Sequence, residues 1–299
     1  LEAFYLTMLD IEHDSRDRTV ENVCVNNAEV DWTSSFVPGH NVAVDSNAVL
    51  SAASNTACDG GPGSSTRFSS NAYGWGCDNP TDPFALQDVY CESGAPDGAQ
   101  VCDCTGGRDW DPAAQYFPVT QSDRSVQLAY TSRSSVVLTL DLECTEETCG
   151  RNFQFAGESS WSTGCTAPDP CQVGQGACDA TCLTAPTALT FNAASMTSNN
   201  LGGMGPNTED PEELRFANVG SASDGTAFDA VITVVGGEYT PRNSAVNGAE
   251  DGTTNMFNIN SGKGAVDIQI AFVDPSTGDA VVLEAFYLTM LDIEHDSRD

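Results

Sequence analysis

The chain begins and ends with the same seventeen residues. Leu1–Asp17 and Leu283–Asp299 both read LEAFYLTMLDIEHDSRD, without one difference. The second copy starts 282 residues after the first. Chance does not produce such an identity, and self-similarity at a fixed period is the signature of repeat proteins. We therefore interpret the chain as one 282-residue unit of a tandem array followed by the start of the next unit. The alternative is an artefactual duplication of one end.

The chain is strongly acidic. It has 43 Asp and Glu against 11 Lys and Arg, which gives a formal net charge of −32. Such a surface repels nucleic-acid phosphates and anionic membranes and attracts cations. Hydrophobic residues make up 40% of the chain, which is enough to bury a core, so the charge does not indicate a disordered tail. We expect a folded protein that does not bind nucleic acid.

Twelve cysteines indicate disulfides rather than metal sites. No CxxC pair occurs and only three histidines are present. An even, high count of this kind is typical of an oxidising compartment. Cys144–Cys149 is the best local pair, although sequence does not fix the pairing. The other disulfide candidates are Cys165, Cys171, Cys178 and Cys182.

The expected location is extracellular or at the cell surface. The chain lacks an initial Met and a signal peptide, so we expect an internal stretch of a longer secreted protein. The most apolar run, Ala280–Leu291, contains Glu284 and is too short to span a membrane. N-glycosylation is not expected, whereas the Ser, Thr and Pro content leaves O-linked sugar open.

Strand patterns dominate the chain. Phe228–Val235 is a short apolar, β-branched run. A further strand is predicted at Asn152–Ala156, and another is predicted to begin at Leu189–Phe191. Evidence for helices is thin. Ala265–Val273 alternates with period two, which places one set of side chains on a single face: Val266, Ile268, Ile270 and Phe272. The sequence predicts an all-β fold of β-sandwich or jelly-roll type.

Two hairpins are predicted. The first joins Ala265–Val273 to Val281–Leu291 through Asp274–Asp279 (DPSTGD), where Pro presets φ and Gly supplies positive φ. The second joins Ser125–Thr131 to Val136–Glu143 through the turn SRSS.

The domain organisation follows from two unusual segments. Residues 73–111 are rich in Gly, Cys, Asp and Pro and indicate a cross-linked excursion from the sheet. Residues 162–188 hold four cysteines and three prolines and indicate a disulfide-stiffened linker. Because this linker lies in mid-period, we expect a circularly shifted β module. Residues 1–161 are then the C-terminal part of one module, completed by the preceding copy, and 189–299 are the N-terminal part of the next.

The repeated strand is the candidate joint between units. In a tandem array, the strand at the start of one unit takes the position that its copy takes in the next. If the copies are separate subunits, the strand can be donated between neighbours by β-addition. Both versions produce a filament. The residues expected at this joint are Phe4, Leu6, Leu9, Phe286, Leu288 and Leu291.

Three alternating acids follow the repeated strand in each copy. Alternation places them on one face if the strand continues, where a bound cation would neutralise them. Oxygen ligands suit Ca²⁺, but the spacing is not that of an EF-hand loop. The alternative is a solvated strand end that binds no metal. These residues are Asp10, Glu12, Asp14, Asp292, Glu294 and Asp296.

The remaining motifs favour structure over catalysis. Asn199–Pro206 (NNLGGMGP) indicates a tight backbone path rather than a phosphate cradle, because the order GxGxxG is missing. Arg215 is expected to pair with a carboxylate. With no GxSxG or HExxH motif and few histidines, we expect no enzyme. Four tryptophans suit core packing, or alternatively a sugar-binding platform: Trp32, Trp75, Trp110 and Trp161.

Several runs carry a resemblance to a known kind of module. They are NNLGGMGPNTEDPEELRFANVG, FDAVITVVGGEYTP, NGAEDG, IQIAFVDPSTGDAVVLEAFYLTMLDIEHD and, after the junction, WGCDNPTDPFAL. Together they resemble a module of large secreted proteins of unicellular algae and related protists. Long repetitive proteins of this kind suit flagellar hairs (mastigonemes) or other extracellular fibrils. The resemblance implies a structural repeat whose partners are copies of itself, and no catalytic residue. The alternative is a secreted adhesin or carbohydrate-binding protein with glycan partners.

Overall fold

The structure is a computed structural model, and the strand is its dominant element. Most of the described residues lie in strands, which confirms the all-β prediction. In the described part no α-helix occurs; the helical elements there are the 3-10 turns η5 (Leu201–Gly203) and η6 (Ser244–Val246). The structure describes residues 6–8, 19–29, 50–54, 65–70, 88–91, 100–102, 119–120, 126–144, 150–161, 187–247, 254–260 and 264–290.

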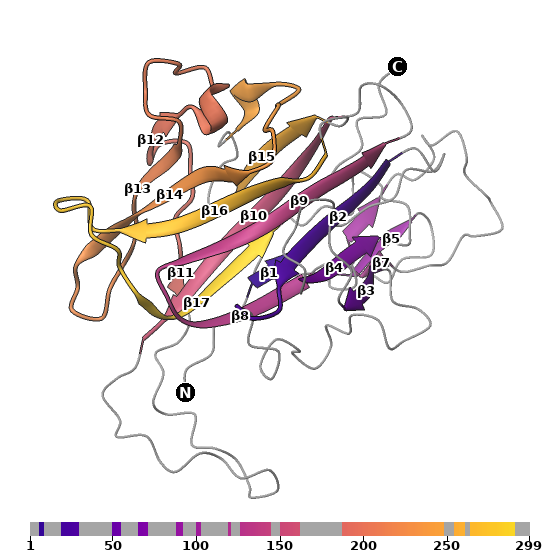
Figure 1. The fold of residues 1–299 in the computed structure, drawn as a ribbon. Coiled ribbons are helices and arrows are strands. Elements are labelled where there is room, and N and C mark those ends of the chain that lie inside the picture. Colours follow the sequence, from indigo (N-terminus) through magenta and orange to yellow (C-terminus); the bar gives the residue numbers. More distant parts are fainter. Residues whose placement is uncertain are drawn as a thin grey trace, which may run out of the picture.

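The largest sheet has eight strands, all paired antiparallel (Figure 1). In spatial order they are β12 (Met196–Asn199), β13 (Leu214–Ser221), β14 (Ala227–Gly236), β16 (Val266–Val273), β9 (Ser135–Cys144), β2 (Thr19–Asn26), β4 (Ser65–Ser70) and β3 (Leu50–Ser54). The first four come from the C-terminal part of the chain and the last four from the N-terminal part. The two parts meet where β16 pairs with β9, with Ile268 opposite Leu138.

A second sheet has six strands. They are β1 (Leu6–Met8), β8 (Val126–Arg133), β17 (Leu283–Met290), β10 (Gly150–Ser160), β11 (Thr187–Ala188) and β15 (Thr254–Asn260). All their pairings are antiparallel except that of β1 with β17. A separate three-stranded sheet contains β5 (Asp88–Cys91), β6 (Gln100–Cys102) and β7 (Val119–Thr120), which lie within or just after the predicted excursion.

Residues of both larger sheets contribute to the hydrophobic core. Along β16, buried and half-buried residues alternate, so the predicted inward face is confirmed. Side chains from both sheets belong to one hydrophobic cluster, and the strands of the two sheets overlie one another in Figure 1. Phe272 of β16 meets Phe286 of β17 edge to face, with ring centroids 4.4 Å apart. Phe155 of β10 stacks on Phe257 of β15 at 4.6 Å. Each fully buried side chain of this size contributes about 1.5–3 kcal/mol.

Both predicted hairpins are wrong, because each turn carries the chain from one sheet to the other. β16 lies in the eight-stranded sheet and β17 in the six-stranded sheet, and the isolated bridge between Val273 and Ala280 pairs the end of β16 with the connecting segment rather than with β17. The same holds for β8 and β9, which part at a bend at Ser134. A strand that crosses to a facing sheet shows the same alternation as one that turns back, so the pattern does not separate the two outcomes.

The other strand predictions have mixed outcomes. Phe228–Val235 falls within β14 and Asn152–Ala156 within β10, as predicted. Leu189–Phe191 is not a strand. Its backbone N–H groups donate first to Gly157 of β10 and then to Val219 of β13, at 2.7 and 2.8 Å. This segment therefore passes between sheets, with Leu189 buried on the way.

Candidate assembly joint

Strand β8 pairs with both copies of the repeated strand. The second copy, β17, pairs with the C-terminal end of β8, where Tyr287 lies opposite Ala129. The first copy, β1, pairs with the other end, where Leu6 lies opposite Leu128. Both pairings are antiparallel.

The two copies use one continuous register on β8. Because Tyr287 faces Ala129 in an antiparallel ladder, the next residue of the same ladder would place Leu288 opposite Leu128. Leu6 faces Leu128 instead, and Leu6 is the copy of Leu288. β8 and β17 each have eight residues, so one full copy would pair along the whole of β8. The two copies thus pair with successive parts of β8 in the register of one strand.

The first copy lies beside the second as well as beside β8. β1 and β17 run parallel with identical residues aligned, so that Leu6 is the partner of Leu288 and Met8 the partner of Met290. This orientation is forced, because two identical strands that are both antiparallel to β8 must be parallel to each other. β1 therefore separates the last three residues of β17 from β8.

The second copy is held on its other side by β10. Phe286 is register partner to Ser159 of β10 and to Tyr130 of β8, so it sits between two strands of the sheet. Phe286 and Leu283 are each 1% exposed, and the ring of Phe286 contacts Phe272 of the facing sheet. The second copy is thus anchored both within its sheet and across the core.

Two titratable groups border this joint. Burial raises the pKa of Glu158, the register partner of Tyr287, to about 6. Burial also raises the pKa of Tyr130 far above its ordinary value; the Glu29 carboxylate adds to this shift and Arg133 opposes it. The environment around β17 is therefore one in which charge is disfavoured.

A buried amide network lies elsewhere, around the segment Asn199–Pro206. The Asn247 side chain donates to the Tyr239 hydroxyl at 2.7 Å and accepts from the Asn258 N–H at 2.8 Å. The Asn199 side chain donates to the Asn247 carbonyl at 2.9 Å. A Cβ on Gly205 would lie 2.0 Å from the Asn199 carbonyl oxygen, which confirms the predicted tight backbone path. The network ties this loop to β15.

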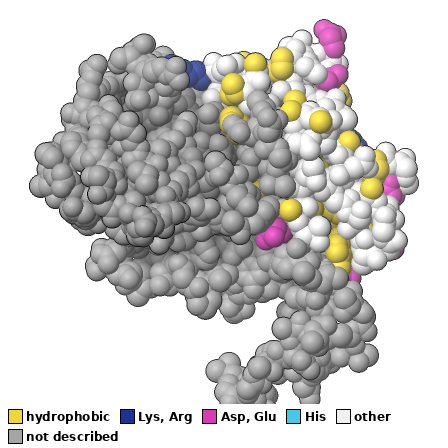
Figure 2. Space-filling model, turned by 180° about the vertical axis from the view of Figure 1, so that it is seen from behind, with side chains coloured by type: hydrophobic (Ala, Val, Ile, Leu, Met, Phe, Trp, Pro, Cys, Tyr) yellow, Lys and Arg dark blue, Asp and Glu magenta, His cyan; other side chains and the backbone are white. Residues whose placement is uncertain are grey.

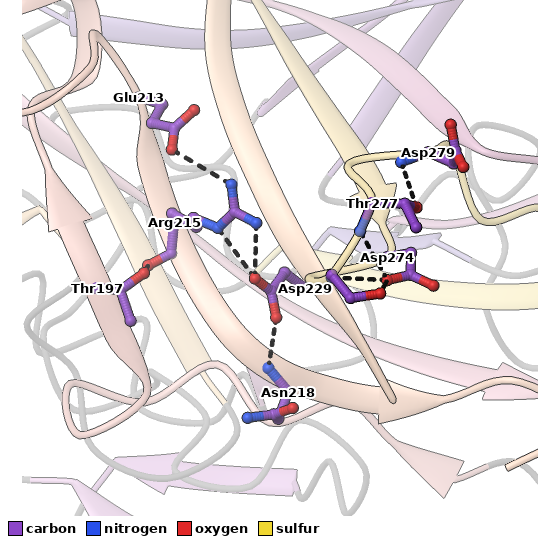
Figure 3. Close-up of polar contacts among 9 residues, drawn as sticks. Thr197, Glu213, Arg215, Asn218, Asp229, Asp274, Thr277 and Asp279 are labelled. Carbon is purple, nitrogen blue, oxygen red and sulfur yellow. Dashed lines mark hydrogen bonds and ion pairs between the residues drawn. The ribbon is translucent and has the colours of Figure 1, made fainter. Parts of the chain in front are cut away.

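Arg215 pairs with a carboxylate, as predicted. Its Nε and Nη2 donate to Oδ2 of Asp229 at 3.0 and 2.8 Å, while Oδ1 of Asp229 accepts the Asn218 N–H at 2.9 Å (Figure 3). Glu213 adds a looser ion pair at 3.7 Å. The pair joins β13 to β14 beside an irregularity in their register, so its role is structural.

The crossing between β16 and β17 is closed by its own side chains. Oδ1 of Asp274 accepts the N–H and the hydroxyl of Ser276 at 2.7 and 2.6 Å, and the N–H of Thr277 at 3.2 Å (Figure 3). These bonds, led by the Ser276 hydroxyl, lower the pKa of Asp274. Gly278 has φ of 77°. The predicted turn chemistry at DPSTGD is therefore present, although the turn does not close a hairpin.

The structure covers part of the predicted site. Of the six joint residues, it describes Leu6, Phe286 and Leu288; Phe4, Leu9 and Leu291 lie outside the described residues. The six carboxylates of the candidate calcium site also lie outside them: Asp10, Glu12, Asp14, Asp292, Glu294 and Asp296. Within the described ranges, no group of three His, Cys, Asp or Glu side chains could hold a metal ion.

The predicted cysteines and tryptophans are covered only in part. Cys144 ends β9, and the other five named disulfide candidates lie outside the described residues: Cys149, Cys165, Cys171, Cys178 and Cys182. Cys24 of β2 is buried and disulfide-bonded. Trp161 is half-buried and packs against the core, whereas Trp32, Trp75 and Trp110 lie outside the described residues.

On the side of the molecule seen in Figure 2, the described residues form no broad apolar face. Figure 2 shows hydrophobic side chains scattered among polar ones, with acidic side chains spaced apart. The exposed large hydrophobic residues of the described part are well separated along the chain: Met204, Val235 and Val282. None of the helices in these ranges has the length and apolar character needed to cross a membrane.

Sequence reasoning missed the strands that receive the repeated strand. β8 and β10 carry no motif that names β17 as their neighbour, because strand pairing is a long-range property. The equal length of β8 and β17 is visible only in the structure, because the strands predicted from the sequence at Ser125–Thr131 and Val281–Leu291 differ in length. Comparison with protein-family models, with curated proteins and with solved structures finds no match to this chain.

Proposed function

We propose that this chain is a structural repeat of an extracellular filament, with tandem-repeat or strand-sharing joints between 282-residue units. The observation that carries the proposal is the single position on β8 where both copies of the repeated strand fit one register. A sequence that keeps two identical strands for one position is suited to linking successive units.

The physical chemistry of strand pairing supports this kind of joint. A strand that is added to a sheet edge forms backbone hydrogen bonds along that edge. Identical side chains then make the same contacts in every unit. Head-to-tail joints that do not close into a ring extend into a fibre. The two facing sheets and their shared core fit the β-sandwich type of module expected from the sequence.

The chemistry of the surface supports an extracellular setting. The disulfide at Cys24 suits an oxidising compartment, and the net charge of −32 keeps long assemblies solvated. The resemblance to modules of secreted algal and protist proteins favours a fibril such as a flagellar hair. Under this proposal the protein is not an enzyme.

Electron microscopy of purified material tests the function. We expect regular fibres from the unaltered protein. Phe286→Asp should abolish them, because a charge would enter a fully buried site between two sheets. Glu284→Gln, at a half-buried site two residues earlier, is the matched control and should leave fibres intact. Particles that never associate, or glycan binding that is lost on Trp161→Ala, would favour the adhesin instead.

A further inference from the structure

We propose that the repeated strand belongs to the unit that precedes it. Each unit then spans Thr19–Met290 and completes its own sheet with the second copy, while the first copy is the last strand of the unit before. This inference rests on the proposed function and chooses between its two kinds of joint.

The second copy is connected to the preceding strand by a short segment. β17 follows β16 after only the residues 274–282, and Asp274 fixes this crossing through three hydrogen bonds. Because the connecting segment is short, pairing of β17 with its own sheet costs little chain entropy. The strand is therefore expected to stay in its own unit.

The second copy contacts two strands of its sheet and the common core. β17 pairs with β10 over five residues, from Ala285 to Thr289, and with β8 at its other edge. Phe286 and Leu283 are buried in the common core. Removing this strand would expose both side chains and leave β10 and β8 without a partner between them.

In the described part, the first copy makes fewer strand pairings than the second. β1 has three residues, Leu6–Met8, paired to β8 and β17. Its place on β8 is the one that Leu288–Met290 would take if the β8–β17 ladder continued. In an isolated chain the first copy is therefore a surplus strand in a position made for the second.

With this assignment, the segment between successive units is short. Between Met290 of one unit and Thr19 of the next lie the nine residues Leu291–Asp299 and then Arg18. Ten residues reach at most about 35 Å, so successive units must stay close. This proposed unit follows the chain order and differs from the circularly shifted module that we expected from the sequence.

The repeated sequence provides a matched test. Phe4 is the copy of Phe286, with the same neighbours on both sides. In the full chain, Phe286→Ala should lower Tm by about 10 °C because it empties a buried site, whereas Phe4→Ala should shift it by about 1 °C or less. The pair Phe286→Leu and Phe4→Leu repeats the comparison more gently if Phe286→Ala does not fold.

Three results would overturn the assignment. The first two are an equal decrease in Tm from the two single changes and a larger decrease from Phe4→Ala. The third is a large decrease in Tm seen only in the double variant, which would mean that either copy can fill the position. Since Tm is measured on single chains, the outcome does not depend on fibres. A missing fibre with the expected Tm pair would refute the filament and leave the assignment standing.

Discussion

At the scale of residues, a few buried polar groups set how neighbouring strands fit. Asp229 is 4% exposed and has both oxygens engaged, one by the Arg215 side chain and one by the Asn218 N–H. The sequence predicted that Arg215 would find a carboxylate, but not which one, because Asp229 lies in the next strand. Which residues are neighbours across strands depends on the pairing register, and the sequence alone does not determine that register.

Asp229→Ala should destabilise the protein. The change leaves a partly buried guanidinium and a backbone N–H without their acceptor. We therefore expect a loss of about 1–3 kcal/mol in the free energy of unfolding. Urea unfolding followed by circular dichroism measures it. Asp224→Ala is the control, because Asp224 is exposed and the hydrogen bonds lost there are those to Thr226 and to its own backbone. Equal losses in the two variants would contradict the role given to Asp229.

Glu158 predicts how stability varies with pH. Its pKa rises from 4.5 to about 6 on folding, because burial disfavours the carboxylate. The stability that it contributes is full below pH 4.5 and is lost as the pH rises through 6. The shift corresponds to about 2 kcal/mol at most, which solvent screening reduces to about 1 kcal/mol.

Glu158→Gln should therefore stabilise the protein at pH 7.5 and change little at pH 4. Thermal unfolding at both pH values measures the difference. A Glu158→Gln variant whose stability follows the pH profile of the unaltered protein would contradict the assignment to this side chain.

At the scale of elements, the sequence predicted strands better than their partners. The alternation in β16 predicted its buried face directly. Successive side chains of a strand point to opposite faces, so a strand with one face in the core has apolar residues at every second position. The turns DPSTGD and SRSS were recognised as turns, yet both join strands of different sheets. Leu189–Phe191 was predicted as a strand because it is apolar, but its hydrogen bonds are divided between two sheets.

The loop around Gly205 gives a prediction at this scale. Gly205→Ala should destabilise the protein by about 1–3 kcal/mol, since the new Cβ would meet backbone atoms 2.0 Å away. Gly225→Ala is the comparison: its φ is +86°, but nothing lies within 4 Å of the new Cβ. Urea unfolding should therefore rank Gly205→Ala as the more costly change. The reverse order would mean that backbone strain outweighs the clash.

At the scale of the whole molecule, the repeated end was visible in the sequence and its receiving position was not. Identity of the two copies pointed to a joint at once. Only the pairing of β8 with both copies relates that joint to a particular place in the fold. The candidate calcium ligands and most of the disulfide candidates fall outside the described residues, so these expectations stay predictions.

Reductant and chelator should affect the filament differently. Twelve cysteines can form six bridges at about 2–4 kcal/mol each, whereas the candidate calcium site is a single feature of each joint. We expect reductant to loosen the fibres more than chelator does, as measured by their bending in electron micrographs. The opposite ranking would make Ca²⁺ the main brace.

The mass of the native chain tests the tandem array most directly. Material from the source, denatured and reduced so that only the backbone holds it together, should contain chains far longer than 299 residues, built from 282-residue units. Mass spectrometry or denaturing electrophoresis gives the answer. A single discrete species of 31.4 kDa would contradict the array and leave only separate subunits that share a strand.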